Sequence, residues 1–343
     1  MEILLILVII VTVSAIIIFH ELGHFAVAKW AGIFVEEFGL GYPPRALGKK
    51  IGETLYSINW IPFGGFVKFF HARHSDNPNN LSLDRSYEHY SIWKRMAMVL
   101  GGIIMNFLVG WILISIVFMI GIPKSILITD VAKGGIAEVA GIKSGDQLMD
   151  LKDGQELINL IDSNKGKEIS LRIKRENQDL TFKVTPRVVV PKGEGNLGIS
   201  MSEAGLAKTG FLRSFWEGAK MSAQLCREIF LGFITLFSAV FSNITLLNNF
   251  VGPVGIINPA VQTAKLGAVY LIQLLGMISL NLAVFNLFPL PALDGGWFLF
   301  LVIEKLRGKP LAAKTERIFN SIGFSFLFLI LIGITIKDIV KLF

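Results

Sequence analysis

The chain has little cysteine and little charge. Its 343 residues include one cysteine, Cys226, and 17% charged residues, against 52% hydrophobic residues and a mean hydropathy of +0.60. One cysteine cannot form a disulfide within the chain, which excludes a disulfide-stapled secreted fold. The apolar excess excludes intrinsic disorder and a collagen-like chain. The composition therefore predicts a polytopic membrane protein.

The net charge of +7 does not indicate a nucleic-acid partner. In a membrane chain, Lys and Arg gather mostly in the cytoplasmic loops, and this sequence has no tail rich in either residue. We expect the lipid bilayer to be the surrounding partner, and we expect no nucleic acid to bind.

Four long apolar runs can cross a hydrocarbon core about 30 Å thick, which needs roughly 20 helical residues. We predict transmembrane α-helices at 3–26, 96–120, 266–290 and 318–336. The first run follows no basic segment and precedes no small-residue cleavage site, so we expect it to be retained rather than removed as a signal peptide.

Basic residues set the expected orientation. Nine Lys or Arg residues lie between the first two runs and five between the last two, so both loops are expected to be cytoplasmic. A fifth apolar stretch, Ile229 to Leu247, cannot also span the membrane without moving Asp294 a full bilayer away from His20 and His24. We therefore predict that residues 203–265 form an amphipathic helical region, either interfacial or re-entrant, interrupted by polar residues and prolines.

Residues 121–202 read as an inserted β-rich domain. Two segments within it, starting at Ile169 and Leu180, alternate apolar and polar residues as half-buried strands do, and glycines separate them. The stretch around Ser144-Gly145-Asp146 resembles bacterial PDZ domains, which bind extended peptides along a sheet edge. The alternative is a small β domain that binds no ligand.

His20-Glu21-Leu22-Gly23-His24 carries the strongest chemical signal. Histidines four residues apart lie on one face of a helix and can both bind Zn²⁺, and the glutamate between them can take a proton from a metal-bound water. Ionisable residues at the end of an apolar span are costly to place, so they indicate function. The alternative is a polar helix end at the membrane surface.

A catalytic zinc usually has three protein ligands, so one more is needed. Asp294 follows the third apolar run, where Pro289 and Pro291 must break the helix at the same expected depth as the two histidines. The alternative for Asp294-Gly295-Gly296 is an ordinary turn. His71, His74 and His89 in the first cytoplasmic loop need no special explanation.

These motifs together resemble the site-2 proteases, which are intramembrane zinc metalloproteases, and most closely the bacterial branch that cleaves anti-sigma factors. The resemblance covers nearly the whole chain: the first-span motif, the Asn286 to Gly296 segment, the PDZ-like insert, and Gly252-Pro253-Val254-Gly255 before the third span. The stretch from about 39 to 70, with Gly64-Gly65-Phe66, looks like the family's membrane re-entrant β-hairpin. The implied fold has four transmembrane helices, this hairpin and one PDZ-like domain.

The resemblance implies His20, His24 and Asp294 as ligands of one Zn²⁺ per chain and Glu21 as the general base. It implies that Asn286 holds the substrate backbone, and strand addition along the hairpin makes Gly64, Gly65 and Phe66 candidate substrate-binding residues. Two departures from the family pattern bear on the site. Ile103 stands where the family has proline, which bears on the role of Asn106, a residue that is either structural or substrate-binding. Only one PDZ-like unit fits, whereas some members carry two.

The implied function is regulated intramembrane proteolysis of single-pass membrane proteins or membrane peptides, such as an anti-sigma factor or a remnant signal peptide. The implied location is the bacterial cytoplasmic membrane, with the active site near the cytoplasmic side and the PDZ-like domain outside. Two other classes remain at this stage: a proton or metal-ion transporter, and an inactive membrane scaffold. Glu21 favours the protease, because transport of a metal needs no base that is not itself a ligand.

Overall fold

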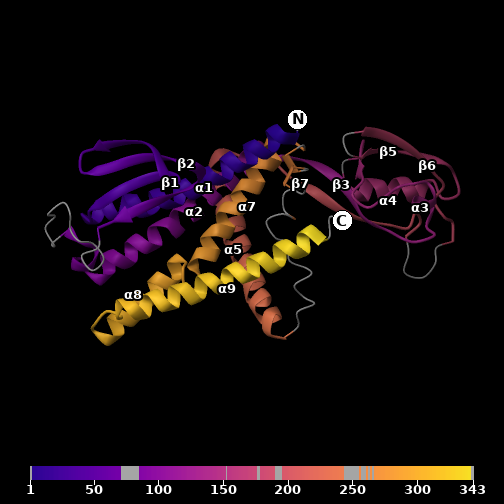
Figure 1. The fold of residues 1–343 in the computed structure, drawn as a ribbon. Coiled ribbons are helices and arrows are strands. Elements are labelled where there is room, and N and C mark those ends of the chain that lie inside the picture. Colours follow the sequence, from indigo (N-terminus) through magenta and orange to yellow (C-terminus); the bar gives the residue numbers. More distant parts are fainter. Residues whose placement is uncertain are drawn as a thin grey trace. The chain divides into compact units, whose positions relative to one another are not determined.

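The computed structural model describes residues 2–340 with the exception of 71–84, 152, 176–177, 190–194, 243–254, 256–259, 262 and 265 (Figure 1). His71, His74, the Gly252-Pro253 motif and the predicted interruptions at Asn243, Asn248, Asn249, Pro253 and Pro259 fall outside the described residues. The chain forms two compact units, one made of Met1–Ile116 with Phe211–Phe343 and the other of Val117–Gly210.

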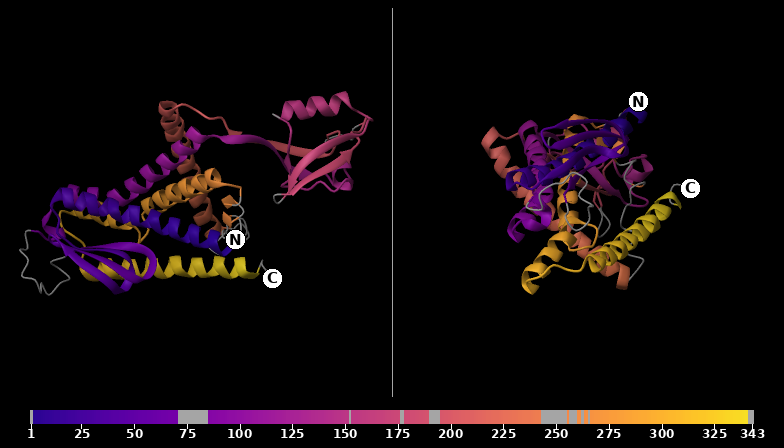
Figure 2. Two further views of the ribbon diagram at one scale, coloured as in Figure 1. Left: turned by 90° about the horizontal axis from the view of Figure 1, so that it is seen from above. Right: turned by 60° about the vertical axis from the view of Figure 1, so that its left-hand side comes forward.

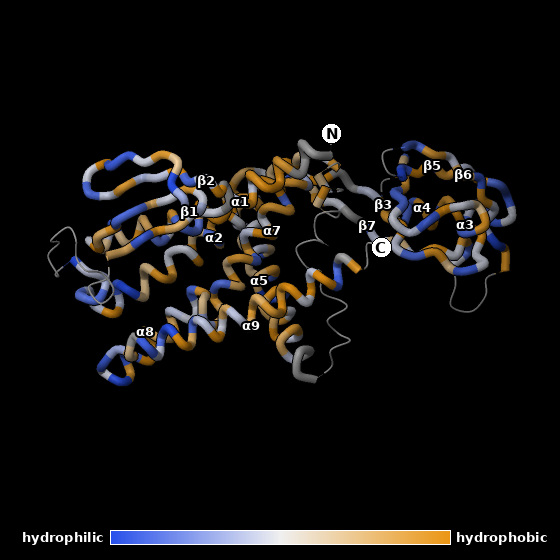
Figure 3. The backbone as a smooth tube through the Cα atoms, viewed as in Figure 1, coloured by the Kyte–Doolittle hydropathy of each residue, from blue (hydrophilic) through white to orange (hydrophobic). Residues whose placement is uncertain are grey.

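Four helices in the described part of the chain are long and apolar enough to cross a membrane. They are α1 (Glu2–Ala31), α2 (Ile92–Ile120), α7 (Ala268–Leu287) and α9 (Ala313–Val340). They coincide with the four predicted runs and confirm a polytopic membrane protein. Hydrophobic residues dominate α7 and the later part of α9 in Figure 3, whereas α8 (Asp294–Arg307) and the start of α9 carry hydrophilic ones.

Helices α1 and α2 approach closely through glycine. A Cβ atom on Gly101 would lie 2.7 Å from the carbonyl oxygen of Gly23, a distance that real side chains do not reach. Helix α8 is joined to the start of α2 by a partly buried ion pair, in which Arg95 Nη1 donates to Glu304 Oε2 at 3.1 Å. These contacts bring the ends of three helices together around the predicted metal site.

A long β-hairpin lies beside α1. Strands β1 (Val35–Ile51) and β2 (Thr54–Phe69) bend so that residues 37–40 pair with both ends of β2: Phe38 has Val67 on one side and Tyr56 on the other. The 65–69 segment is therefore an edge, since its outer side has no strand partner among the described residues. The structure confirms a hairpin in the predicted region, and its insertion into the membrane stays a prediction.

Charged groups hold the hairpin turn against α1. Glu53 Oε1 accepts hydrogen bonds from Arg85 at 2.9 Å and from Lys29 of α1 at 3.0 Å. The hydrogen bonds from Arg85, followed by those from Lys29, lower the pKa of Glu53 to about 2. The turn therefore stays anchored by an ionised carboxylate at neutral pH.

The second unit is a β domain. Its sheet has the order β6-β5-β4-β3-β7, and α4 lies across one face (Figures 1 and 2). Its elements are β3 (Ile122–Val131), α3 (Ile136–Val139), β4 (Gln147–Leu148), α4 (Gly154–Ser163), β5 (Ile169–Arg175), β6 (Gln178–Val184) and β7 (Ile199–Leu206). The alternation predicted at Ile169 is present, because Ile169, Leu171 and Ile173 of β5 are buried in one core.

Asp146 closes the glycine-rich turn of this domain. Its buried carboxylate accepts hydrogen bonds from the Lys143 backbone N–H at 2.8 Å and from Arg175 Nε and Nη2, each at 2.7 Å. Burial by itself would raise the pKa of Asp146, but the bonds from Arg175 and Lys143 outweigh it and lower the pKa below its ordinary value. The ionised form is therefore the one that stabilises the fold.

The β domain is expected to lose stability in acid. Because the folded pKa of Asp146 lies below the unfolded one, its contribution is present above the ordinary aspartate pKa of about 4 and is lost as pH falls through the folded value. Asp146→Asn should cost roughly 1–3 kcal/mol at pH 7 and weaken this pH dependence. Hydrogen exchange of β4 and β5 amides in the full chain measures both. Asp150→Asn, in an ion pair whose side chains are more than half exposed, is the control.

Within the predicted amphipathic region, 203–265, the structure places one long helix, α5 (Phe211–Ser242), and residues 203–206 belong to strand β7 instead. Near its start, the backbone oxygen of Phe215 accepts a hydrogen bond from the indole of Trp111 in α2 at 2.9 Å. Further along, Phe230 stacks on Phe288 with ring centres 5.0 Å apart, and Phe233 lies 5.2 Å from Phe285. The helix therefore follows α7 as far as the break that precedes Asp294.

Candidate active site

His20 and His24 lie one turn apart on α1, as the spacing predicts. Their Nε2 atoms are 3.2 Å apart, and the two rings are nearly perpendicular, at 89°. Both residues are 8% exposed. The pair thus presents two ring nitrogens to one point within the protein.

Asp294 reaches the same point from the other half of the chain. Helix α7 ends at Leu287, Phe288 is extended, and α8 starts at Asp294, so the break falls at Pro289 and Pro291 as predicted. A Cβ atom on Gly295 would lie 2.5 Å from the Leu287 carbonyl oxygen, so the turn requires glycine.

The three predicted ligands surround one position. Asp294 Oδ2 is 3.1 Å from His20 Nε2 and 3.3 Å from His24 Nε2. Two ligands of a tetrahedral zinc, each about 2.05 Å from the ion, lie about 3.3 Å apart. The observed separations fit that ion, and Asp294 Oδ2 is buried with no hydrogen-bond partner among the described residues. Two imidazoles and one carboxylate are a donor set that catalytic zinc uses, with one position left open.

Helix α2 orients both histidines. His24 Nδ1 is 2.8 Å from the Met98 carbonyl oxygen, which can only accept, so Nδ1 carries the proton and Nε2 keeps its lone pair for a metal. On the other side, Asn106 Nδ2 lies 3.2 Å from His20 Nδ1, and Asn106 Oδ1 is buried without a partner in the described structure. A 180° flip of the carboxamide exchanges these two atoms, so that Oδ1 accepts a hydrogen bond from His20 Nδ1–H. The lone pair of His20 Nε2 is then available to a metal, as that of His24 Nε2 is.

Asn106 is itself held in place, because Ser279 of α7 donates a hydrogen bond to its backbone oxygen at 2.7 Å. The residue is fully buried. In the described structure it therefore contacts a predicted ligand, and the choice between its two predicted roles, structural and substrate-binding, stays a prediction. Gly102, four residues earlier, lies against both imidazoles.

Glu21 lies next to the three ligands without joining them. It lines a cavity of about 300 Å³ together with His24 and Asp294. A Cβ atom on Gly65 of the hairpin edge would be 3.7 Å from Glu21 Cγ, so the edge passes directly beside the carboxylate side chain. Glu21 is thus placed to serve a molecule bound at both the edge and the metal position.

The remaining predicted residues lie around this centre. Gly64 and Gly65 face α1, whereas the Phe66 ring packs over Gly39, on the other face of the strand. Asn286 is half-buried in the last turn of α7 and does not line the cavity that holds Glu21. His89, in the short 3₁₀ turn η2 (Tyr87–His89), lies against Tyr90 and outside the metal cluster.

Sequence reasoning gave no site role to several residues that the structure places at the site: Phe69, Met98, Gly102 and Trp297. For Gly102 a signal existed, since it lies four residues before Asn106 on the same face of α2. For Met98 there was none, because its contact with His24 is made by a backbone oxygen, which any residue carries.

A His-Glu-x-x-His helix whose two histidines meet an aspartate in a possible metal site, in a chain with four candidate membrane spans, is the pattern of an intramembrane zinc metalloprotease. The family model for Peptidase family M50 matches residues 8–330, and the chain belongs to this family, the site-2 proteases. It is 34% identical over 335 residues to a putative zinc metalloprotease of Clostridium perfringens, covering 95% of this chain and 96% of that protein. It is 27% identical over 417 residues to the regulator of sigma-W protease RasP of Bacillus subtilis, covering 97% and 98%.

The protein is therefore a multi-pass membrane hydrolase that uses Zn²⁺. Membership in the family decides among the three function classes. The transporter and the inactive scaffold are set aside, and the zinc endopeptidase predicted from the motifs is confirmed.

Proposed function

We propose that His20, His24 and Asp294 hold the catalytic zinc and that Glu21 is the general base for peptide-bond hydrolysis within the membrane. The observation that carries the assignment is the set of three separations between the ligand atoms, 3.1, 3.2 and 3.3 Å. A bound zinc would polarise the scissile carbonyl and lower the pKa of a bound water. Glu21 takes the proton from the attacking water and transfers it to the departing amine.

The substrate is proposed to enter as an extended strand. A transmembrane helix hides its amides in hydrogen bonds, so it must unwind before cleavage. The 65–69 edge has no strand partner on its outer side among the described residues and passes beside Glu21, which supports strand addition along Gly64, Gly65 and Phe66. Asn286, in the last turn of α7, is proposed to hold the substrate backbone on the other side.

The surrounding architecture is proposed to follow the family. The hairpin at about 39–70 is re-entrant, 121–202 is a PDZ-like domain outside the cytoplasm, and 1–120 and 266–343 are the two membrane halves. Within 203–265, the contacts of Phe230 and Phe233 near Asp294 favour a re-entrant helix over an interfacial one. The zinc lies near the cytoplasmic side of a bacterial cytoplasmic membrane, and the substrates are single-pass proteins such as an anti-sigma factor.

Zinc content tests the ligand assignment without a substrate. The wild type should hold one zinc per chain, and Asp294→Ala should weaken its zinc affinity by about 100-fold or more, because losing even an outer partner costs 10–100-fold. Metal analysis after dialysis against a chelator series measures this. Asp153→Ala, which removes the carboxylate that caps α4 in the β domain, should leave zinc unchanged. Equal zinc affinity in wild type and Asp294→Ala would overturn the proposed ligand set.

Proline tests the proposed substrate edge. Phe66→Pro removes the Phe66 N–H, which lies on the side of β2 that pairs with β1, and it also removes the ring that packs over Gly39. The edge strand is distorted as a result, so cleavage should slow by about tenfold or more while zinc stays bound. Phe66→Leu, which keeps the N–H, is the matched control. Cleavage rates of a membrane-anchored reporter compare the two, and equal rates in both variants would exclude strand addition at this edge.

A further inference from the structure

The cavity beside Glu21 has its polar groups on α1, through Glu21 and His24, and at the start of α8, through Asp294. Its remaining walls come from strand β2, the turn η2, and helices α2 and α8. The apolar side chains that line them are Val67, Phe69, Tyr87, Met98, Val99 and Trp297. Such a pocket, mostly apolar with a few convergent polar groups, is typical of ligand sites in proteins.

The cavity walls that face the protein interior are formed by tightly packed side chains. Tyr87, Met98 and Val99 are 8%, 5% and 5% exposed and belong to the core that joins α1, α2 and α8. Met98 is further fixed by its backbone contact with His24. The shape of this part of the cavity is therefore set by the fold and does not depend on a flexible loop.

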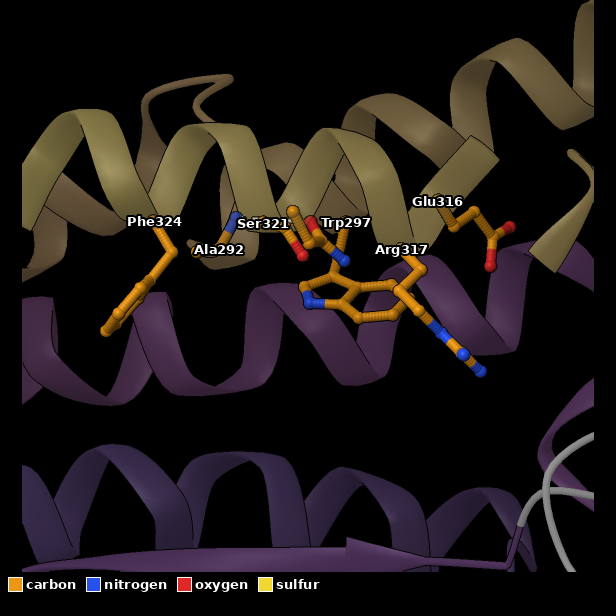
Figure 4. Close-up of a pocket in the computed structure, with 7 residues that line it drawn as sticks. Ala292, Trp297, Glu316, Arg317, Ser321 and Phe324 are labelled. Atoms are coloured by element: carbon orange, nitrogen blue, oxygen red, sulfur yellow. Dashed lines mark hydrogen bonds between the residues drawn. The ribbon is translucent and has the colours of Figure 1, made fainter. Parts of the chain in front are cut away.

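Trp297 bounds the cavity on its exposed side. It is 39% exposed and also lines a second hollow of about 450 Å³ along α9. Figure 4 shows its indole in the middle of that hollow, with Ser321 and Phe324 toward one end and Arg317 and Glu316 toward the other. One ring thus forms a wall of both spaces.

The position of the cavity defines what it can hold. Glu21, His24 and Asp294 line it, so whatever fills it lies next to the bond being cleaved. Gly65, Val67 and Phe69 alternate along the edge strand and share one face, so a strand added there directs every second side chain toward this space. A volume of about 300 Å³ is at the lower limit for small-ligand pockets, which suits one bulky side chain.

We propose that this cavity is the subsite that selects a bulky apolar side chain, of the Leu, Met or Phe class, at one residue flanking the scissile bond. This inference rests on the proposed function of the adjoining residues. The fixed apolar wall makes side-chain size the selected property, because a cavity of set volume rewards the group that fills it and excludes a larger one.

Val99 provides a test in both directions. The probe is a set of synthetic apolar peptides in detergent micelles, in which the four positions on each side of a central bond are varied among Ala, Val, Leu, Phe and Trp. Purified full-length enzyme cleaves them, and mass spectrometry reads the products. In Val99→Ala the preference at one flanking position should move toward Phe and Trp, and in Val99→Phe toward Ala and Val, each by roughly 10- to 100-fold relative to wild type.

Val117 supplies the matched controls. It is a buried valine on the same helix, 0% exposed, and it does not line the cavity. Val117→Ala and Val117→Phe should leave the preference unchanged, and zinc content shows that all four variants are folded. A merely structural role for Val99 would lower cleavage of every peptide equally in both pairs.

The outcomes separate this inference from the proposed function. One outcome would overturn the subsite alone: Glu21→Gln loses cleavage, while both Val99 variants keep the size preference of wild type. Cleavage that persists in Glu21→Gln, or no cleavage of any peptide by zinc-loaded wild type, would contradict the proposed function and the subsite with it. A size preference that moves in opposite directions in Val99→Ala and Val99→Phe would establish the subsite.

Discussion

Glu21→Gln is expected to lower the rate of peptide-bond cleavage by roughly 10²- to 10⁴-fold while zinc remains bound. General acid–base catalysis by a positioned side chain contributes rate factors of this size. Glutamine keeps the shape of the side chain but cannot accept a proton at neutral pH. Since Glu21 is not one of the three groups that converge on the metal position, its replacement leaves the ligand set complete. Single-turnover cleavage of a membrane-anchored reporter, with zinc measured on the same sample, tests both halves of the prediction.

The control for charge is Glu228→Gln, which removes an exposed carboxylate on α5 that pairs with Gln224. It should cleave at the wild-type rate. If Glu21→Gln lost its zinc along with its activity, Glu21 would be acting on the metal site, and the assignment as general base would be wrong. If it kept full activity, another group would have to accept the proton.

The local part of the site could be predicted because helix geometry determines it. Histidines four apart share a face in any α-helix, so His20 and His24 needed no knowledge of the rest of the fold. Asp294 is 270 residues beyond His24. It could still be chosen as the third ligand, because the two prolines before it break the third apolar run at the membrane depth expected for the histidines. In a soluble protein no such restriction on depth would exist.

The hairpin face could not be predicted from its sequence. Successive residues of a strand point to opposite faces, so a shift of one residue exchanges the set that meets the neighbouring helix. Glycines at 64 and 65 gave no apolar pattern from which to choose. In the structure Val67 and Phe69 point toward the cavity, and the Phe66 ring packs over Gly39. The packing of β2 against α1 determines this orientation.

The extent of α5 was also beyond the sequence. The sequence predicted an amphipathic helical region over 203–265 that contains the apolar stretch Ile229 to Leu247, but it did not fix where a helix begins or ends. In the structure one helix runs from Phe211 to Ser242, and contacts through Phe215 and Phe230 stabilise it. Packing against α2 and α7 outweighs the change in composition along the helix.

Gly102→Ala is expected to weaken zinc binding by about 100-fold, although it adds only one methyl group. That Cβ would lie 2.7 Å from Cε1 of His20 and 2.7 Å from Cε1 of His24. Neither ring can turn aside without losing its contact with α2, His24 with the Met98 oxygen and His20 with Asn106. The two helices must separate instead, which moves both histidines relative to Asp294, and outer contacts of this kind are worth 10–100-fold in metal affinity.

Gly333→Ala on α9 is the matched control, because a Cβ there meets no atom of the described structure within 4 Å. Alanine is the better helix former by up to about 1 kcal/mol, so this variant should be at least as stable as wild type and bind zinc equally well. Competition with a chelating dye at fixed pH compares the three proteins. If Gly102→Ala bound zinc as tightly as wild type, the two imidazoles that face Gly102 would not be the metal ligands. A methyl group at that distance must displace at least one of the two rings.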